Sequence, residues 1–185
     1  MNLKLSKIML TTLLLSGTTL LHAAGGQGQG SGQVQFHGYI VNAPCSIVSD
    51  NPIKVEFGQI SNKLLNNGTA YNGESHIEPF AIELADCDIT DLTDGTVATT
   101  FTYTSAAVEG VGENYVGLDS LPDSGAGIVI VAGNEQVVNG TALKPKKIQN
   151  GPNTLEFTSF VKGLGQGPVK TGEFYANANF TLAYQ

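Results

Sequence analysis

Few side chains in this sequence have the type and spacing that chemistry requires. After the apolar N-terminal stretch only two histidines remain, His37 and His76, and neither has a second ligand at metal-binding spacing. Catalysis needs titratable groups that converge on one point, and the sequence offers no such set. We interpret both histidines as surface or packing residues, with His37 on the polar side of an alternating segment. The sequence therefore predicts no catalytic residue, no metal site and no cofactor.

An acidic stretch is the other candidate for chemistry. Asp86, Asp88, Asp91 and Asp94 could suggest calcium, because hard cations prefer carboxylate oxygens. Their spacing departs from the twelve-residue calcium loop, which places acids at alternate positions and a glutamate at its end. We interpret the stretch as a solvated loop. The glycine-rich run at 163–168 lacks the strand–turn–helix context of a phosphate loop and is also interpreted as a loop.

The N-terminus has the pattern of a secretory signal peptide. Lys4 and Lys7 precede Ile8–Leu21, an apolar run of 14 residues. A membrane anchor is the alternative, but a helix needs about 20 apolar residues to span a bilayer. We expect residues 1–23 to be removed, with the cut between residues 23 and 25.

The charge of the exported chain excludes some partners. Without the two N-terminal lysines, seven basic residues face 16 acidic ones, a net charge near −9. All seven are lysines, so the chain has no arginine that could clamp a phosphate with two hydrogen bonds. We therefore expect no nucleic-acid partner, since polyanions are repelled.

The two cysteines, Cys45 and Cys87, are predicted to form a disulfide bond. An even number of cysteines in an exported chain favours a bridge over free thiols, because the compartment is oxidising. A zinc site or a nucleophilic cysteine is weaker, since neither residue has a histidine nearby in sequence.

Runs of β-branched and aromatic residues predict an all-β fold in one domain. The expected strands are Ile53–Phe57, Phe80–Leu84, Val97–Thr104, Tyr115–Leu118, Gly127–Val131 and Thr154–Val161. Asn-Gly and Asp-Gly dipeptides between them are typical of tight turns. Residues 59–65 could form one helical turn, and no segment after the signal peptide shows a sustained helical period. The pattern indicates an antiparallel β-sandwich.

Two segments near the ends of the chain alternate most clearly. After the glycine-rich run at 25–32, Val34, Phe36, Gly38 and Ile40 share one face. In the last fourteen residues one strand face is formed by Gly172, Phe174, Ala176, Ala178, Phe180, Leu182 and Tyr184. The N-terminal segment could be the first strand of its own sandwich or be donated to another chain, and composition alone leaves both possibilities open.

The mature chain resembles the subunits of chaperone–usher pili, close to the major pilins of the P-pilus and type 1 kind. The resemblance covers most of the chain and lies in four segments: QVQFHGYIVNAPCSI at 33–47, VEFGQIS at 55–61, IELADCDIT around Cys87 and the GEFYANANFTLAYQ ending. In that family a glycine fourteenth from the end and a tyrosine next to last belong to the chaperone-binding strand. Gly172 and Tyr184 occupy those places.

The resemblance implies an incomplete immunoglobulin-like sandwich of six strands at residues 44–185, with a hydrophobic groove beside the C-terminal strand. Residues 24–43 would be the extension that donates its strand to another subunit. A periplasmic chaperone would fill the groove first, and exchange at an outer-membrane usher would then build a homopolymer on the cell surface that mediates adhesion. The resemblance also implies that the bridge joins the first body strand to the strand near Cys87.

Two alternatives stay open at this point. A minor adaptor subunit has the same fold, although the full leader and terminal motif favour a repeating subunit. A self-contained secreted carbohydrate-binding sandwich would need exposed aromatic platforms, and the chain has no tryptophan.

Overall fold

The computed structural model describes residues 32–67, 71–107 and 114–185. The chain divides into two units, Met1–Ile40 and Val41–Gln185. The expected signal peptide, its cut site and most of the glycine-rich leader lie outside the described residues and stay predictions. No helix among the described residues is long and apolar enough to cross a membrane.

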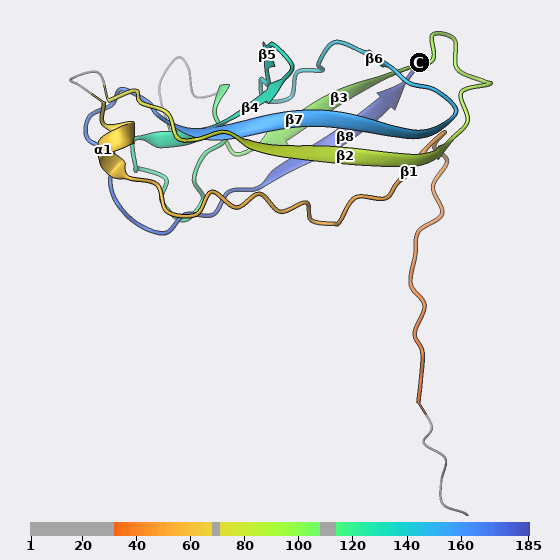
Figure 1. The fold of residues 1–185 in the computed structure, drawn as a ribbon, viewed down its shortest axis with the longest axis horizontal. Helices are drawn as coiled ribbons and strands as arrows, with labels where there is room; N and C mark the ends of the chain where they lie inside the picture. The colour runs from red at the N-terminus through yellow and green to blue at the C-terminus, as the bar shows by residue number, and fades with distance from the viewer. Residues whose placement is uncertain (1–31, 68–70, 108–113) are drawn as a thin grey trace, which may run out of the picture. The chain divides into compact units, whose positions relative to one another are not determined.

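The larger unit is built from two antiparallel sheets. The first contains, in spatial order, β1 (Ser46–Ile47), β2 (Glu78–Cys87), β7 (Gly151–Gly163), β4 (Ala126–Ala132) and β5 (Glu135–Gln136). The second contains β6 (Lys146–Lys147), β3 (Thr96–Tyr103) and β8 (Ala178–Tyr184). Figure 1 shows β2 and β7 side by side, with β3 and β8 in the other layer. The all-β prediction is confirmed.

The core lies between the sheets and follows from the alternation of the long strands. In β7 the side chains of Leu155, Phe157 and Val161 are buried, whereas Glu156 between them is exposed. From the second sheet Phe101 joins the same apolar cluster. Because successive residues of a strand point to opposite faces, this alternation buries one face of each sheet against the other.

Four of the expected strands are found and two are not. Residues 53–57 carry no strand among the described residues, although their side chains alternate between the core and solvent. The expected strand Tyr115–Leu118 is reduced to isolated bridges from Val116 to Ser105 and Ile128. Alternation reports which side chains are buried, but a strand also needs a hydrogen-bonded neighbour.

Local structure elsewhere agrees with the sequence in part. The helical turn α1 (Asn62–Leu65) lies inside the expected range and buries Leu65. The terminal strand begins later than expected, because β8 starts at Ala178 and residues 172–177 carry no strand in the described chain.

The described part of the first unit, residues 32–40, also carries no strand, which differs from the alternation in its sequence. The apolar side chains of Val34, Phe36 and Ile40 are exposed. Extended backbone counts as a strand only where a strand beside it supplies its hydrogen bonds, and residues 32–40 pair with none of the strands in the described chain.

Candidate functional site

The strand β8 forms an edge of the smaller sheet. It pairs with β3 along its whole length, from Val97 opposite Tyr184 to Tyr103 opposite Ala178. Within the described residues no strand lies on its other side. An edge strand presents unpaired backbone N–H and C=O groups to any strand that approaches it. The free side of β8 is therefore a docking edge for extended backbone.

The free edge of β8 borders a groove of about 560 Å³. Its opposite wall is formed by residues 47–57, which carry no strand beyond Ile47 in the described chain. The lining comprises Ile47, Ser49, Asp50, Asn51, Pro52, Ile53, Val55, Phe57, Phe80, Phe101, Val116, Ile128, Ile130, Ser159, Ala176, Asn177, Ala178, Asn179 and Phe180. Asp50 is the single charged residue among them, so the groove suits an uncharged segment with apolar side chains.

The floor of the groove is aromatic. Phe101 from β3 contacts the ring of Phe80 edge to face, with centroids 6.4 Å apart, and Phe180 from β8, with centroids 6.3 Å apart. Beneath them Phe157 stacks on Phe80 at 5.3 Å and meets Phe101 at 5.1 Å. Strands from both sheets thus build an apolar floor of packed rings. A docked side chain would contact this floor without entering the core.

The expected face of the C-terminal segment lies along this groove only in part. Phe174, Ala176, Phe180, Leu182 and Tyr184 are partly buried and pack against the core. Burial raises the pKa of the Tyr184 hydroxyl above its ordinary value. Of the seven expected residues Ala176, Ala178 and Phe180 line the groove; Ala178 is exposed there, and Gly172 is exposed without lining it.

The structure adds a contact that the hydrophobic pattern does not reveal. The backbone N–H of Tyr175 donates to the hydroxyl of Ser120 at 2.9 Å, and that hydroxyl donates to the carbonyl of Glu173 at 3.2 Å. The N–H of Asp119 donates to the carbonyl of Tyr175 at 2.8 Å. Polar side chains that replace strand pairing leave no periodic signal in a sequence, which is why these residues were missed.

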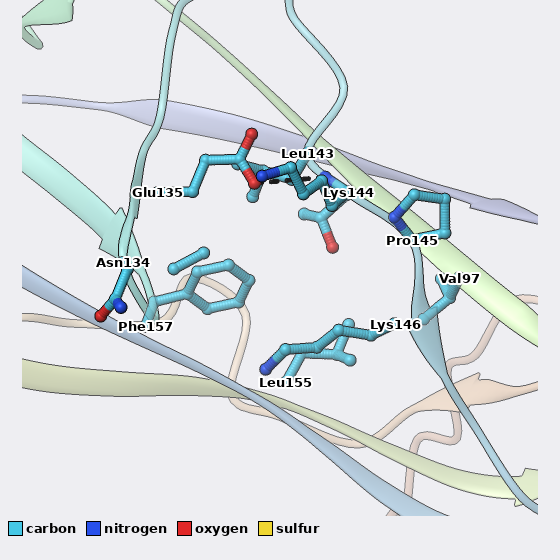
Figure 2. A pocket seen from close by; sticks show the side chains of 11 residues that line it. Val97, Asn134, Glu135, Leu143, Lys144, Pro145, Lys146, Leu155 and Phe157 are labelled. Atoms are coloured by element: carbon cyan, nitrogen blue, oxygen red, sulfur yellow. Dashed lines mark hydrogen bonds between the residues drawn. The ribbon is translucent and has the colours of Figure 1, made fainter.

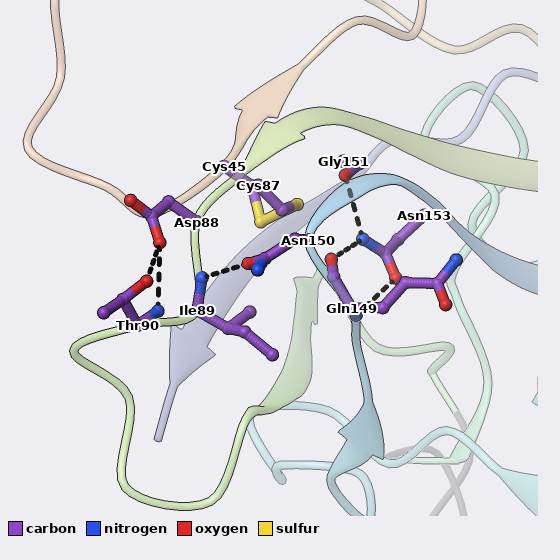
Figure 3. The surroundings of a disulfide bond; sticks show 9 residues. All are labelled: Cys45, Cys87, Asp88, Ile89, Thr90, Gln149, Asn150, Gly151 and Asn153. Atoms are coloured by element: carbon purple, nitrogen blue, oxygen red, sulfur yellow. Dashed lines mark hydrogen bonds between the residues drawn. A yellow bond between two sulfur atoms is a disulfide. The ribbon is translucent and has the colours of Figure 1, made fainter.

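A disulfide bond joins Cys45 to Cys87, as predicted (Figure 3). Both cysteines are buried, and the N–H of Asp88 donates to the carbonyl of Pro44 at 2.9 Å beside them. The bridge ties the start of the larger unit to the end of β2, next to the short β1–β2 ladder. It fixes the residues that lead into the groove wall.

Asp88, Asp91 and Asp94 lie in the loop after Cys87, as expected, whereas Asp86 belongs to β2. The hydroxyl and the N–H of Thr90 both donate to Asp88 Oδ1, and these hydrogen bonds hold the pKa of Asp88 below its ordinary value (Figure 3). Within the described residues no group of three or more histidine, cysteine or acidic side chains could hold a metal ion. His76 lies on the surface, with Nε2 at 2.9 Å from Glu78 Oε1.

A second hollow of about 290 Å³ contains none of the expected site residues (Figure 2). Leu155 and Phe157 lie at its base, and Lys144, Lys146 and Glu135 at its rim. The backbone N–H of Lys144 approaches Glu135 Oε2 at 3.5 Å. The edge strands at its rim, β5 and β6, are two residues long each, so this hollow offers extended backbone a much shorter edge than β8 does.

Comparisons with known proteins agree with this geometry. A family described as "Fimbrial protein" matches residues 34–185. The Fimbria A protein of Serratia marcescens is 40% identical, with 99% of this chain and 100% of the relative covered. The Major MR/P fimbria protein of Proteus mirabilis is 35% identical, with the same shares covered.

Two solved structures resemble the chain as well. A chaperone–usher pilus, solved to explain rod uncoiling, shares 31% identity and a TM-score of 0.75, with 88% of this chain and 100% of the other covered. The P pilus rod subunit PapA shares 31% identity and a TM-score of 0.65, with 77% and 100% covered. These matches support the incomplete immunoglobulin-like sandwich. The chain belongs to the fimbrial protein family.

Proposed function

We propose that this structural fimbrial subunit polymerises by donor-strand exchange, giving the segment Val34–Ile40 to the groove of a neighbouring copy. The single observation that carries the proposal is the groove beside β8: in the described residues β8 has no strand on its groove side, and the opposite wall, residues 48–57, carries no strand. A strand placed there would pair with β8 on one side. Addition of a strand to an open sheet edge is an established recognition mode, of which chaperone–pilin complexes are an instance.

The donor segment has apolar surface to contribute. The side chains of Val34 and Phe36 are 74% and 90% exposed, and Ile40 is fully exposed. Full burial of such a side chain is worth about 1.5 to 3 kcal/mol, before the cost of ordering the strand. Three side chains together with the ladder hydrogen bonds are enough for a durable joint.

Gly38 is the position at which a donor side chain would be shortest. Alternation places it on the same face as Phe36 and Ile40, toward the groove floor. Between these two large residues a glycine allows the donor backbone to approach a shallow part of that floor. A bulky side chain at position 38 would hold the strand away.

The partners and the route follow from the same proposal. Before assembly a periplasmic chaperone covers the groove, and an outer-membrane usher directs the exchange as the chain passes to the cell surface. The fimbrium then contributes to adhesion. Relatives from Proteus mirabilis and Escherichia coli are named as major fimbrial proteins, which supports a repeating subunit over a minor adaptor.

The test is assembly of the mature chain with and without residues 25–42. The intact chain should form ladders that resist detergent on gels, and the shortened chain should form none while still folding with an added peptide of residues 32–44. A stable monomer from both chains would refute the exchange.

A second test addresses the glycine. Gly38→Leu should slow ladder formation strongly, since the added side chain meets the groove floor. The matched control is His37→Leu, which adds a leucine on the opposite face of the same strand. Equal ladder growth by the two variants would show that position 38 does not face the groove.

A further inference from the structure

In the terminal segment, residues 173–177 are held by different contacts from those that hold β8. The β3–β8 ladder ends at Tyr103 opposite Ala178, yet Ala176 and Asn177 line the groove as well. In the described residues no strand backs 173–177. Something other than a sheet neighbour must keep this part of the groove wall extended.

Residues 119–121, which we call the clasp, take that place. The hydroxyl of Ser120 accepts the Tyr175 N–H and donates to the Glu173 carbonyl, so one side chain fills two positions of a ladder. The N–H of Asp119 donates to the Tyr175 carbonyl at 2.8 Å. Asn177 Nδ2 donates to Asp119 Oδ2 at 3.1 Å. Four hydrogen bonds thus join the clasp to the wall.

The clasp is itself anchored to both sheets. Val116 bridges Ser105 beyond the end of β3 and Ile128 in β4. The N–H of Gly117 donates to the carbonyl of Thr104 at 2.7 Å, and Leu118 is buried. Because residues 116–118 are fixed at these points, the clasp that follows them can position the groove wall.

The pattern of these bonds leaves the groove side of the wall free. In an extended strand the N–H and C=O of one residue point to one side, and those of its neighbours point to the other. Because both backbone groups of Tyr175 face the clasp, those of Phe174 and Ala176 face away from it, toward an incoming strand. The clasp therefore occupies one edge of this wall and presents the other.

We propose that Ser120 and Asp119 are positioning residues for strand exchange, which hold residues 173–177 extended so that a donor strand pairs along the full groove. This inference rests on the proposed function. Without the clasp, the donor would have to order residues 173–177 itself, and the lost conformational entropy would shorten the lifetime of the joint.

The experiment uses polymers of the intact mature chain and follows the decay of the detergent-resistant ladder with time at fixed temperature. Ser120→Ala should shorten the half-life about tenfold, which corresponds to about 1.4 kcal/mol and to the loss of a hydrogen bond or two. Ser120→Thr retains the hydroxyl and should restore the half-life.

The matched control is Ser75→Ala. The hydroxyl of Ser75 likewise accepts an N–H, from Val161 at 2.9 Å, and donates to the His76 carbonyl at 2.8 Å, but neither partner belongs to residues 173–177 of the groove wall. This variant loses two bonds of the same kind and should leave the half-life within about twofold, since no bond to the groove wall is lost. Equal half-lives for the two alanine variants would overturn the proposal.

Hydrogen exchange localises the effect. In Ser120→Ala polymers the amides of residues 174–177 should exchange faster, while those of 178–184 keep the wild-type rate. If Ser120→Ala does not accumulate, Asp119→Ala removes only the bond to Asn177 and should shorten the half-life about threefold. An unchanged half-life in that variant would also refute the role of the clasp, whereas a wild-type chain without any ladder would refute donor-strand exchange itself.

Discussion

Removal of the Cys45–Cys87 bridge should cost this fold a large share of its stability. The perturbation is the double substitution Cys45→Ala and Cys87→Ala, which leaves no free thiol and changes the volume of the buried site little. The bridge closes a loop of 42 residues. The chain-entropy relation assigns such a loop about 4 kcal/mol, because the unfolded chain regains the freedom that the bridge removes.

The location of the bridge adds a structural consequence. Beyond Cys45 the chain is held by β1, whose ladder with β2 spans two residue pairs, Ser46 with Ala85 and Ile47 with Leu84. Without the disulfide this short ladder alone would retain the start of the groove wall. We therefore expect the double variant to lose assembly before it loses all secondary structure.

Guanidinium unfolding of the mature chain, at a concentration that keeps it monomeric, measures the effect. Near-ultraviolet circular dichroism of tyrosine reports tertiary structure, since the chain has six tyrosines and no tryptophan. The slope of the transition should rise as the unfolded state expands. Asn150→Ala is the control: it keeps the bridge, removes the bond from the Ile89 N–H at 2.9 Å and should cost about 1 kcal/mol. A double variant within about 1 kcal/mol of the parent would refute the loop-closure reasoning.

Two further predictions concern the groove floor and the acidic loop. Phe101→Ala should lower the free energy of unfolding by about 3 to 5 kcal/mol, because its buried ring contacts three others, whereas exposed Thr102→Ala should change it little; a loss below about 1.5 kcal/mol would refute a core role. Thr90→Val should raise the pKa of Asp88 toward its ordinary 3.8, as read by carboxyl carbon NMR, while the Thr90 N–H keeps part of the shift. Since the folded pKa is lowered, the contribution of Asp88 to stability is present above pH 3.8 and is lost as the pH falls through the folded pKa. An unchanged pKa in Thr90→Val would rule out the hydroxyl as its cause.

The long strands could be predicted from sequence because their signal is local. In β2, β3, β4 and β7 the β-branched, aromatic and other apolar residues are concentrated within one segment of the chain, bounded by turn residues. The three two-residue strands β1, β5 and β6 could not be found in this way, since two residues have no period. The disulfide needed only the cysteine count and the export signal.

The groove was harder to predict than the strands around it. Its floor joins Phe80 and Phe101, from the consecutive strands β2 and β3, with Phe180 from β8 at the other end of the chain. The segment at 53–57 alternates like a strand, and its sequence cannot reveal that the ladder beside it is missing. At Ser120 the ladder is replaced by a hydroxyl, which no hydrophobic pattern records. Hydrophobic alternation predicts which side chains are buried, but it does not predict which backbone segments are hydrogen-bonded to one another.

The groove beside β8 also sets the valence of the subunit. Each copy has one donor segment, and its described residues contain one groove beside the free edge of β8, so a copy joins at most two neighbours. Head-to-tail joining of this kind gives an open linear chain that does not branch. A copy without residues 25–42 would act as a chain terminator, and mean length would fall in inverse proportion to its share of the mixture. Fibre length would then be set by the supply of subunits and terminators, since the joint is the same at every position along the fibre.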